Sequence, residues 1–471
     1  MNSREIPPVE VRFHPCSFSD SVGRLFWWRG ELYRGITASG VALYERIIRD
    51  GTVARLVEQG LLIETRLTDL SLDGFSIVLQ HRTLPFVSYP NCWCPSMLRD
   101  AACVTADLVI ELERSGLTLT DAAAWNVLFD GGQPVFVDFS SIVPAQSLDT
   151  HSWRGYDDLL TYFLLPLELS AQGFAPLARW VLADYEHGPI QSNLLALWAQ
   201  RTPTAENAGD LSIWRSVLKS RAPSLLRRLT MRVARTTGSA QTKTTYRADR
   251  VRQLRDTIAR VPVPSAAAGF VVGETSEPPL LPSDPWTEKH RAVHRVLASK
   301  RPATVLDVGC GNGWYARLAA QFGSAVVAVD SDERWVEACY LAVRTERLPI
   351  LPLVMDIRYP SPGQGIGNDV LAPASQRLRC ELVLMLGLVH ILVFKHYHRL
   401  EQIAATLATF AKKMALVEFI PPSDPEVRTI GGEEFSWYTL DNFTRALQEH
   451  FHSVEAVRSH PQGRMLLFCE K

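Results

Sequence analysis

The ten residues from 304 to 313, TVLDVGCGNG, constrain the fold of this chain more than any other feature. They form a short apolar run that contains Asp307, followed by Gly309, Gly311 and Gly313 and then by a helix-like segment. Such a run is typical of a buried parallel strand, and glycines at its end let the backbone turn tightly against a ligand. The pattern predicts the strand–turn–helix unit that binds nucleotide-type cofactors in doubly wound sheets.

A second apolar run, residues 325–329, strengthens this prediction. It ends in Asp330, about 20 residues after Gly309, where an acidic side chain can accept hydrogen bonds from both hydroxyls of a ribose. Ser331 is expected to line the same turn. A glycine loop followed by an acid at this spacing is far more specific than a glycine loop alone.

The spacing of the glycines differs from the dinucleotide-binding fingerprint. It is GxGxG rather than GxGxxG, and Asp307 stands inside the strand, just before the first glycine. A pyrophosphate is bound by free backbone N–H groups and is disfavoured by a nearby acid. A sulfonium cofactor is instead positively charged and carries an ammonium on its amino-acid tail. The arrangement resembles motif I of the class I S-adenosylmethionine-dependent methyltransferases, which implies S-adenosyl-L-methionine as the cofactor.

The C-terminal part alternates strand and helix patterns, as a parallel sheet requires. Strands are predicted at 304–308, 325–329, 350–355, 382–386 and 414–419, and helices at 333–345 and 399–412. A helix at 440–450 and strands near 454–457 and 464–468 complete the pattern. The resemblance implies a Rossmann-like α/β fold, mostly parallel, closed by an antiparallel hairpin.

The same resemblance implies cofactor-binding roles for residues at the strand ends. The three loop glycines would let the backbone approach the methionine part, and Asp307 would act on its ammonium. Asp356 stands where this class contacts the adenine amino group, with a turn cap as its alternative role. Met355 and Ile357 would pack the adenine ring, and Leu386 would complete the site.

Methyl transfer to a hydroxyl or amine requires that a proton be removed from the acceptor. His390, just after the fourth strand, is the best-placed base, with a packing role as the alternative. Glu418, at the end of the fifth strand, is a weaker candidate that could instead orient His390. Trp286 and Lys289 either close over the cofactor or pack against the sheet.

The N-terminal region follows a different, α+β pattern. Residues 23–36 alternate around an Arg-Gly turn, as a β-hairpin does. Helices are predicted over 39–59 and 96–115, and strands at 61–65 and 75–79.

The stretch TDAAAWNVLFDGGQPVFVDFSS then resembles the catalytic and metal-binding loops of protein-kinase-like phosphotransferases. In such enzymes the residue at Asp121 orients the acceptor hydroxyl, while those at Asn126 and Asp138 hold magnesium. However, no lysine precedes Lys219, and Arg34 is not equivalent to a phosphate-binding lysine. The chain is therefore predicted to carry a kinase-like domain that has lost phosphoryl transfer, with an active phosphotransferase as the alternative.

The domain prediction is a kinase-like domain at 1–200, a basic helical connector and linker at 201–283, and the methyltransferase domain at 284–471. Residues 219–260 hold twelve Lys and Arg against two Asp. They are interpreted as a solvated helical face, with an anionic partner as the alternative.

Composition excludes several classes of protein. A net charge of −1 does not indicate a nucleic-acid-binding protein, and the scattered cysteines predict no metal site. No apolar run is long enough to span a membrane, and the start does not resemble a signal peptide. A cytoplasmic location is therefore expected.

Taken whole, the chain resembles bacterial methyltransferases similar to the rhizobial nodulation protein NoeA. The matching segments are FVSYP, SMLRDAA, the kinase-like stretch, VLDVGCGNG, LPLVMD, LGLVH and VEFIPPSDP. The resemblance implies a methyltransferase whose acceptor is a small molecule or a carbohydrate. The alternatives are the N-terminal phosphotransferase and a scaffold that binds the cofactor without catalysis.

Overall fold

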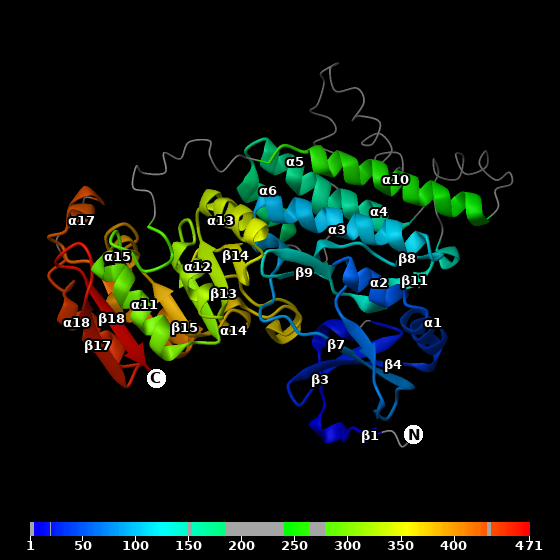
Figure 1. Cartoon of the computed structure of the whole chain (residues 1–471), viewed down its shortest axis with the longest axis horizontal. Helices are drawn as coiled ribbons and strands as arrows, with labels where there is room; N and C mark the ends of the chain where they lie inside the picture. The colour runs from blue at the N-terminus through cyan, green and yellow to red at the C-terminus, as the bar shows by residue number, and fades with distance from the viewer. Residues whose placement is uncertain (1–3, 19, 149–152, 184–239, 264–277, 431–434) are drawn as a thin grey trace, which may run out of the picture. The chain divides into compact units, whose positions relative to one another are not determined.

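The computed structural model divides the chain into two compact units (Figure 1). It describes residues 4–18, 20–148, 153–183, 240–263, 278–430 and 435–471. The first unit comprises residues 1–83, 89–128 and 134–264, and the second comprises residues 84–88, 129–133 and 265–471.

The first unit begins with an antiparallel sheet in the order β2-β3-β4-β7-β5. Its strands are β2 (Arg12–Phe13), β3 (Gly23–Trp28), β4 (Glu31–Ile36), β5 (Thr65–Leu67) and β7 (Ile77–His81). The predicted hairpin is confirmed as β3–β4. Arg29 and Gly30 at its turn take φ values of 51° and 82°, the left-handed conformation that two-residue hairpin turns require.

Two N-terminal predictions were wrong. The predicted helix at 39–59 is two helices, α1 (Ala38–Arg49) and α2 (Thr52–Glu58). Gly51 separates them with a φ of 82°, which is incompatible with a continuous helix. Of the predicted strand at 61–65, only Thr65 lies in a strand, as the first residue of β5, while Leu62 makes an isolated bridge to Phe136.

The rest of the first unit is mainly helical. Its helices include α3 (Pro95–Glu113), α4 (Arg154–Asp158), α5 (Leu165–Ala171), α6 (Ala175–Leu182) and α10 (Ala240–Arg260). Four short strands lie between α3 and α4: β8 (Leu117–Leu119), β9 (Val127–Asp130), β10 (Gln133–Phe136) and β11 (Ile142–Pro144). The loops after β8 and β10 carry Asp121, Asn126 and Asp138, so the kinase-like motif lies on two neighbouring loops of this unit.

Helix α10 lies along α3 (Figure 1) and buries Val251, Leu254 and Ile258. Arg247 of α10 forms a buried ion pair of 2.9 Å with Glu113 of α3. Residues 240–260 thus belong to the first unit, whereas the sequence suggested a connector. Because Arg247, Arg252 and Arg255 of this helix form ion pairs within the first unit, these charges give no support to an anionic partner. The remainder of the basic segment, 219–239, lies outside the described residues.

The second unit contains a seven-stranded sheet in the order β14-β13-β12-β15-β16-β18-β17. The strands are β12 (Thr304–Val308), β13 (Ala325–Asp330), β14 (Ile350–Val354), β15 (Cys380–Met385), β16 (Ala411–Phe419), β17 (Ser453–Arg458) and β18 (Met465–Glu470). The first five in this order are parallel to one another, β18 is antiparallel to β16, and β17 is antiparallel to β18. The predicted mostly parallel sheet with its closing hairpin is confirmed.

Helices cover both faces of this sheet. Helices α11 (Glu288–Lys300), α12 (Trp314–Gln321) and α13 (Glu333–Glu346) share one apolar core with the strands. Helix α16 (Leu400–Phe410) contacts β15, β16 and α18 (Leu440–Gln448). The helix predicted at 399–412 ends at 410 because β16 begins at the next residue.

The chain leaves β12 toward β13 and β14 on one side of the sheet and later adds β15 and β16 on the other. The carboxyl ends of β12 and β15 therefore form a topological switch point, where open α/β sheets bind their ligands. In the described part of the chain, no helix is both long and apolar enough to cross a bilayer.

Candidate cofactor-binding and active site

The glycine loop after β12 uses its three glycines in different ways. Gly309, Gly311 and Gly313 all have positive φ values, 73°, 53° and 81°. A Cβ added at Gly311 would meet no atom within 4 Å, whereas one at Gly313 would lie 2.6 Å from the sulfur of Cys339 on α13. Gly311 thus faces open space, and Gly313 is also required by helix packing. At Gly309 an added Cβ would touch Leu388 at 3.4 Å.

Asp330, the last residue of β13, holds the loop in place. One carboxylate oxygen accepts a hydrogen bond from the Gly311 N–H at 3.0 Å, and the other accepts from the Asp332 N–H at 2.9 Å. Burial raises the pKa of Asp330 above its usual value. Each oxygen retains a lone pair for a further donor such as a ribose hydroxyl. Ser331 is exposed in the same turn.

Asp307 is buried inside β12, and its Oδ2 has no hydrogen-bond partner among the described residues. Burial, together with the negative charge of Asp330, raises the pKa of Asp307 to about 7. A buried carboxylate oxygen without a partner is costly, about 1–3 kcal/mol, and indicates a site for a donor that is supplied from outside the protein.

The residues after β14 combine apolar packing with an ion pair. Met355 and Ile357 are buried. Asp356 binds the guanidinium of Arg358 through both carboxylate oxygens and also accepts the Arg358 backbone N–H at 2.9 Å. Burial raises the pKa of Asp356, but the bonds to Arg358 outweigh this effect, so the pKa is lowered overall. Asp356 is therefore a turn cap, and an adenine contact would have to use its remaining lone pairs.

His390 lies on α15 (Val389–Phe394), just after β15 and the buried Leu386. Its side chain is buried, its Nε2 is 3.7 Å from a carboxylate oxygen of Glu426, and its Nδ1 has no partner among the described residues. Burial lowers the pKa of His390 even though Glu426 opposes the shift. The imidazole is therefore neutral near pH 7, as a general base must be.

Glu418, near the end of β16, is fully buried and has a partner for each oxygen. It accepts hydrogen bonds from the ammonium of Lys289 at 2.7 Å and from the hydroxyl of Ser459 at 2.6 Å. This arrangement suits an ion-pair partner of Lys289 rather than a base or a residue that orients His390. Sequence reasoning missed this cluster because its members are far apart in the chain.

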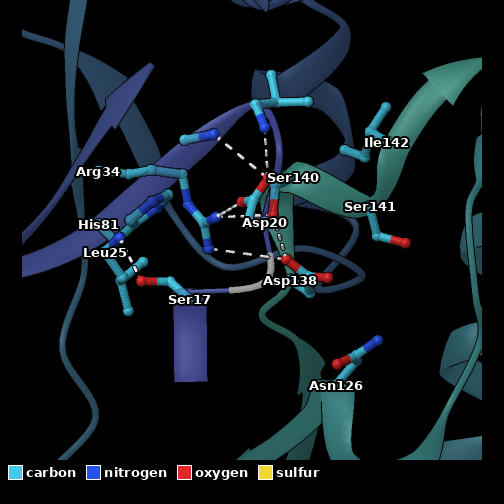
Figure 2. Close-up of polar contacts among 12 residues, drawn as sticks. Ser17, Asp20, Leu25, Arg34, His81, Asn126, Asp138, Ser140, Ser141 and Ile142 are labelled. Atoms are coloured by element: carbon cyan, nitrogen blue, oxygen red, sulfur yellow. Dashed lines mark hydrogen bonds and ion pairs between the residues drawn. The ribbon is translucent and has the colours of Figure 1, made fainter. Parts of the chain in front are cut away.

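Arg34 of β4 is the centre of a polar cluster that includes Asp138 of the kinase-like motif (Figure 2). Its guanidinium lies 2.6 Å from a carboxylate oxygen of Asp20, donates to the hydroxyl of Ser140 at 2.7 Å, and lies 3.7 Å from Asp138. Ser140 in turn donates to Asp138 at 2.7 Å. Arg34 is buried and its charge is balanced by these two acids, although its Nε has no hydrogen-bond partner among the described residues.

Asp121 and Asn126 lie close together, as the motif predicts. The Asn126 amide donates to a carboxylate oxygen of Asp121 at 2.5 Å. Burial and the charge of Asp138 raise the pKa of Asp121. Across the described parts of the chain, no group of three or more His, Cys, Asp or Glu side chains is arranged to hold a metal ion.

A comparison with models of known protein families found a match within the second unit. The sequence model of a family described as a methyltransferase domain matches residues 287–450. This segment contains the glycine loop, Asp330 and His390. The second unit is an S-adenosylmethionine-dependent methyltransferase domain. Its cofactor is S-adenosyl-L-methionine.

The chain is also similar to a curated protein along almost its whole length. It is 28% identical over 459 residues to the nodulation protein NoeA of Rhizobium meliloti (strain 1021), covering 92% of this chain and 90% of that protein.

Solved structures with detectable similarity include three methyltransferases. The N-methyltransferase NodS from Bradyrhizobium japonicum WM9 is 14% identical, with a TM-score of 0.29, and the match covers 39% of this chain and 93% of that chain. A magnesium protoporphyrin IX methyltransferase from Synechocystis PCC 6803 is 16% identical, with a TM-score of 0.27 and coverage of 38% and 76%. The bifunctional kinase-methyltransferase WbdD is 17% identical, with a TM-score of 0.28 and coverage of 37% and 36%, so the match spans well under half of that chain.

Proposed function

We propose that the methyltransferase domain methylates a hydroxyl or amine of a small-molecule or carbohydrate acceptor, with His390 as the base. The observation that carries this proposal is a pair of buried polar atoms without partners in the described chain. Asp307 Oδ2 lies in β12 and His390 Nδ1 follows β15, and these strands are neighbours at the switch point. An acid for the cofactor and a base for the acceptor are thus both available.

The residues around the loop fit the cofactor. When bound, S-adenosylmethionine supplies a methyl group on a positively charged sulfur. Ionised Asp307 would bind the ammonium of its tail, and Asp330 would accept from the ribose hydroxyls while it holds Gly311. The open space beside Gly311 leaves room for the tail to approach the backbone. Met355 and Ile357 would pack the adenine, beside Ser331 and Leu386.

His390 would take the proton of the acceptor as the methyl group is transferred. Its lowered pKa keeps the imidazole neutral and ready to accept a proton. The Glu426 carboxylate, 3.7 Å from Nε2, would stabilise the imidazolium that results. The presence of this base favours catalysis over a scaffold that only binds the cofactor.

Two measurements test this function. Calorimetry with S-adenosylhomocysteine should show binding, and absence of heat at high micromolar ligand would contradict the cofactor site. Incubation of a cell extract with the enzyme and methyl-labelled cofactor, followed by mass spectrometry, should identify the labelled acceptor. Labelling confined to the enzyme itself, or no labelling at all, would contradict a small-molecule or carbohydrate acceptor.

For the first unit, we propose a kinase-like scaffold without phosphoryl transfer. Its support is the position of Asp20, whose carboxylate binds Arg34, a basic residue that is not equivalent to the missing lysine. A guanidinium already neutralised by Asp20 and Asp138 attracts a nucleotide phosphate weakly.

A thermal-shift titration with ATP and magnesium distinguishes this scaffold from an active phosphotransferase. We expect no magnesium-dependent stabilisation of the wild-type protein. Strong stabilisation that disappears in Asp138→Ala, but persists in the exposed-site control Asp73→Ala, would favour the phosphotransferase.

A further inference from the structure

Lys289, in the first turn of α11, is held at the ligand-binding edge of the sheet by a buried ion pair. Its ammonium lies 2.7 Å from one oxygen of Glu418, and the other oxygen of Glu418 accepts from Ser459. Glu418 has no exposed surface, whereas the Lys289 side chain retains 17% exposure. The carboxylate is thus fully enclosed, and the ammonium remains partly accessible.

The surroundings of this pair place it beside the cofactor loop. A Cβ added at Gly387, two residues after the end of β15, would lie 3.9 Å from Glu418 Oε2. The Lys289 ammonium is 5.5 Å from the ring centroid of Tyr315, the second residue of α12, which follows the glycine loop. Lys289 therefore lies between the helix that follows the loop and the ends of β15 and β16.

The number of N–H donors on Lys289 exceeds the number of hydrogen-bond acceptors that the described residues supply to it. An ammonium has three N–H donors, and the structure shows one of them bonded, to Glu418. The charge of Lys289 also opposes the effect of burial on the pKa of Asp307, so the two groups are electrostatically coupled. Together they offer one cationic and one anionic group at the same edge of the sheet.

A methionine tail is a zwitterion that needs both kinds of group. We infer that Lys289 binds the carboxylate of the methionine tail while Asp307 binds its ammonium, an assignment that rests on the proposed function. Glu418 and Ser459 are positioning residues in this arrangement, because they fix the ammonium of Lys289 in place without touching the cofactor.

The test compares two ligands that differ by one group. S-adenosylhomocysteine carries the carboxylate, and its decarboxylated analogue keeps the amine and lacks only that carboxylate. We expect the wild-type protein to bind S-adenosylhomocysteine about tenfold to 100-fold more tightly, as a charge-assisted hydrogen bond should provide. Lys289→Gln should bring both ligands to the same, weaker affinity.

Two further variants keep the test decisive. Lys289→Gln combined with Glu418→Gln avoids a stranded buried charge and should lose the preference in the same way. Lys300→Gln is the matched control, because Lys300 lies on the same helix in an exposed ion pair of 2.7 Å with Glu470. A preference that survives in the folded double variant would overturn the inference. Failure of the wild-type protein to bind either ligand would instead contradict the proposed function itself.

Discussion

The two polar sites of this chain differ in where their buried groups find partners. In the first unit, the charge of Arg34 is paired with Asp20 and Asp138 and its guanidinium donates to Ser140, although its Nε has no partner among the described residues. In the methyltransferase domain, Asp307 and His390 each keep a buried atom without a partner in the described chain. Unpaired buried groups destabilise a fold unless something else satisfies them. The comparison indicates that the first site neutralises its buried cation with acids of the same unit, whereas the second leaves a buried acid and a buried base available to ligands.

The largest effect that would sharpen this comparison is expected at His390. His390→Ala should lower the turnover number about 10²–10⁴-fold, because a general base is lost. Affinity for S-adenosylhomocysteine should change little. The wild-type pH–rate profile should lose activity only below the usual imidazole pKa of about 6.5, because burial lowers the pKa of His390.

The measurement uses the acceptor found by methyl labelling, with His450→Ala as an exposed control. A turnover number of His390→Ala close to that of the wild type would make His390 a packing residue.

The next largest effect is expected in the first unit. Asp20→Ala removes the closest acid from buried Arg34, and loss of one partner of a buried ion pair costs about 3 kcal/mol or more. Chemical denaturation should show a destabilised first unit, with the exposed Asp73→Ala unaffected. If Asp20→Ala is as stable as the wild type, the site of the first unit does not depend on its internal ion pair, and the contrast between the two sites is lost.

A smaller effect is expected at Asp330. Asp330→Ala should weaken S-adenosylhomocysteine binding by about 1.5–3 kcal/mol, because it removes an ionised acceptor. Part of the loss would come from the glycine loop, since Asp330 also accepts the Gly311 N–H. Calorimetry against the exposed control Asp369→Ala measures it. Unchanged affinity in Asp330→Ala would exclude the ribose role.

The smallest effect concerns pH. Because the pKa of Asp307 is raised to about 7, the carboxyl is largely protonated in mildly acidic solution, and ammonium binding requires it to ionise. Affinity for S-adenosylhomocysteine should therefore rise as the pH increases, by up to about tenfold per unit below about pH 7.

Asp307→Asn should bind more weakly and lose this pH dependence. The pH dependence of the protein's stability has the opposite sign to the pH dependence of its affinity for the ligand. The folded, ligand-free state binds more protons than the unfolded state between about pH 4 and about pH 7, so its stability contribution falls as pH rises through that window. A flat affinity profile in the wild-type protein would remove Asp307 from the ammonium site.

The methyltransferase sheet could be predicted from the sequence because contiguous residues encode each strand and the glycine loop. Each strand is a short apolar run, and the ligand loop lies directly after one of them. The pairing of β12 with β13 brings Asp330 beside the glycine loop, so the proximity of these residues also follows from the predicted strand order.

The ion pairs could not be predicted because they depend on tertiary packing. Lys289 and Glu418 are on different elements, and no spacing rule joins them. Asp20 likewise reaches Arg34 from the segment before β3. Asp356 and Arg358 are only two residues apart, but their ion pair was not predicted, because the resemblance implied an adenine contact for Asp356.

The packing of α10 against α3 determines which N-terminal fragments of this chain can fold. A fragment that stops near residue 200 would lack α10 and would expose the face of α3 that Val251, Leu254 and Ile258 cover. It would also leave the Glu113 carboxylate buried without Arg247. Such a fragment should aggregate when expressed alone, whereas one that extends to residue 264 retains the helix that completes the N-terminal fold.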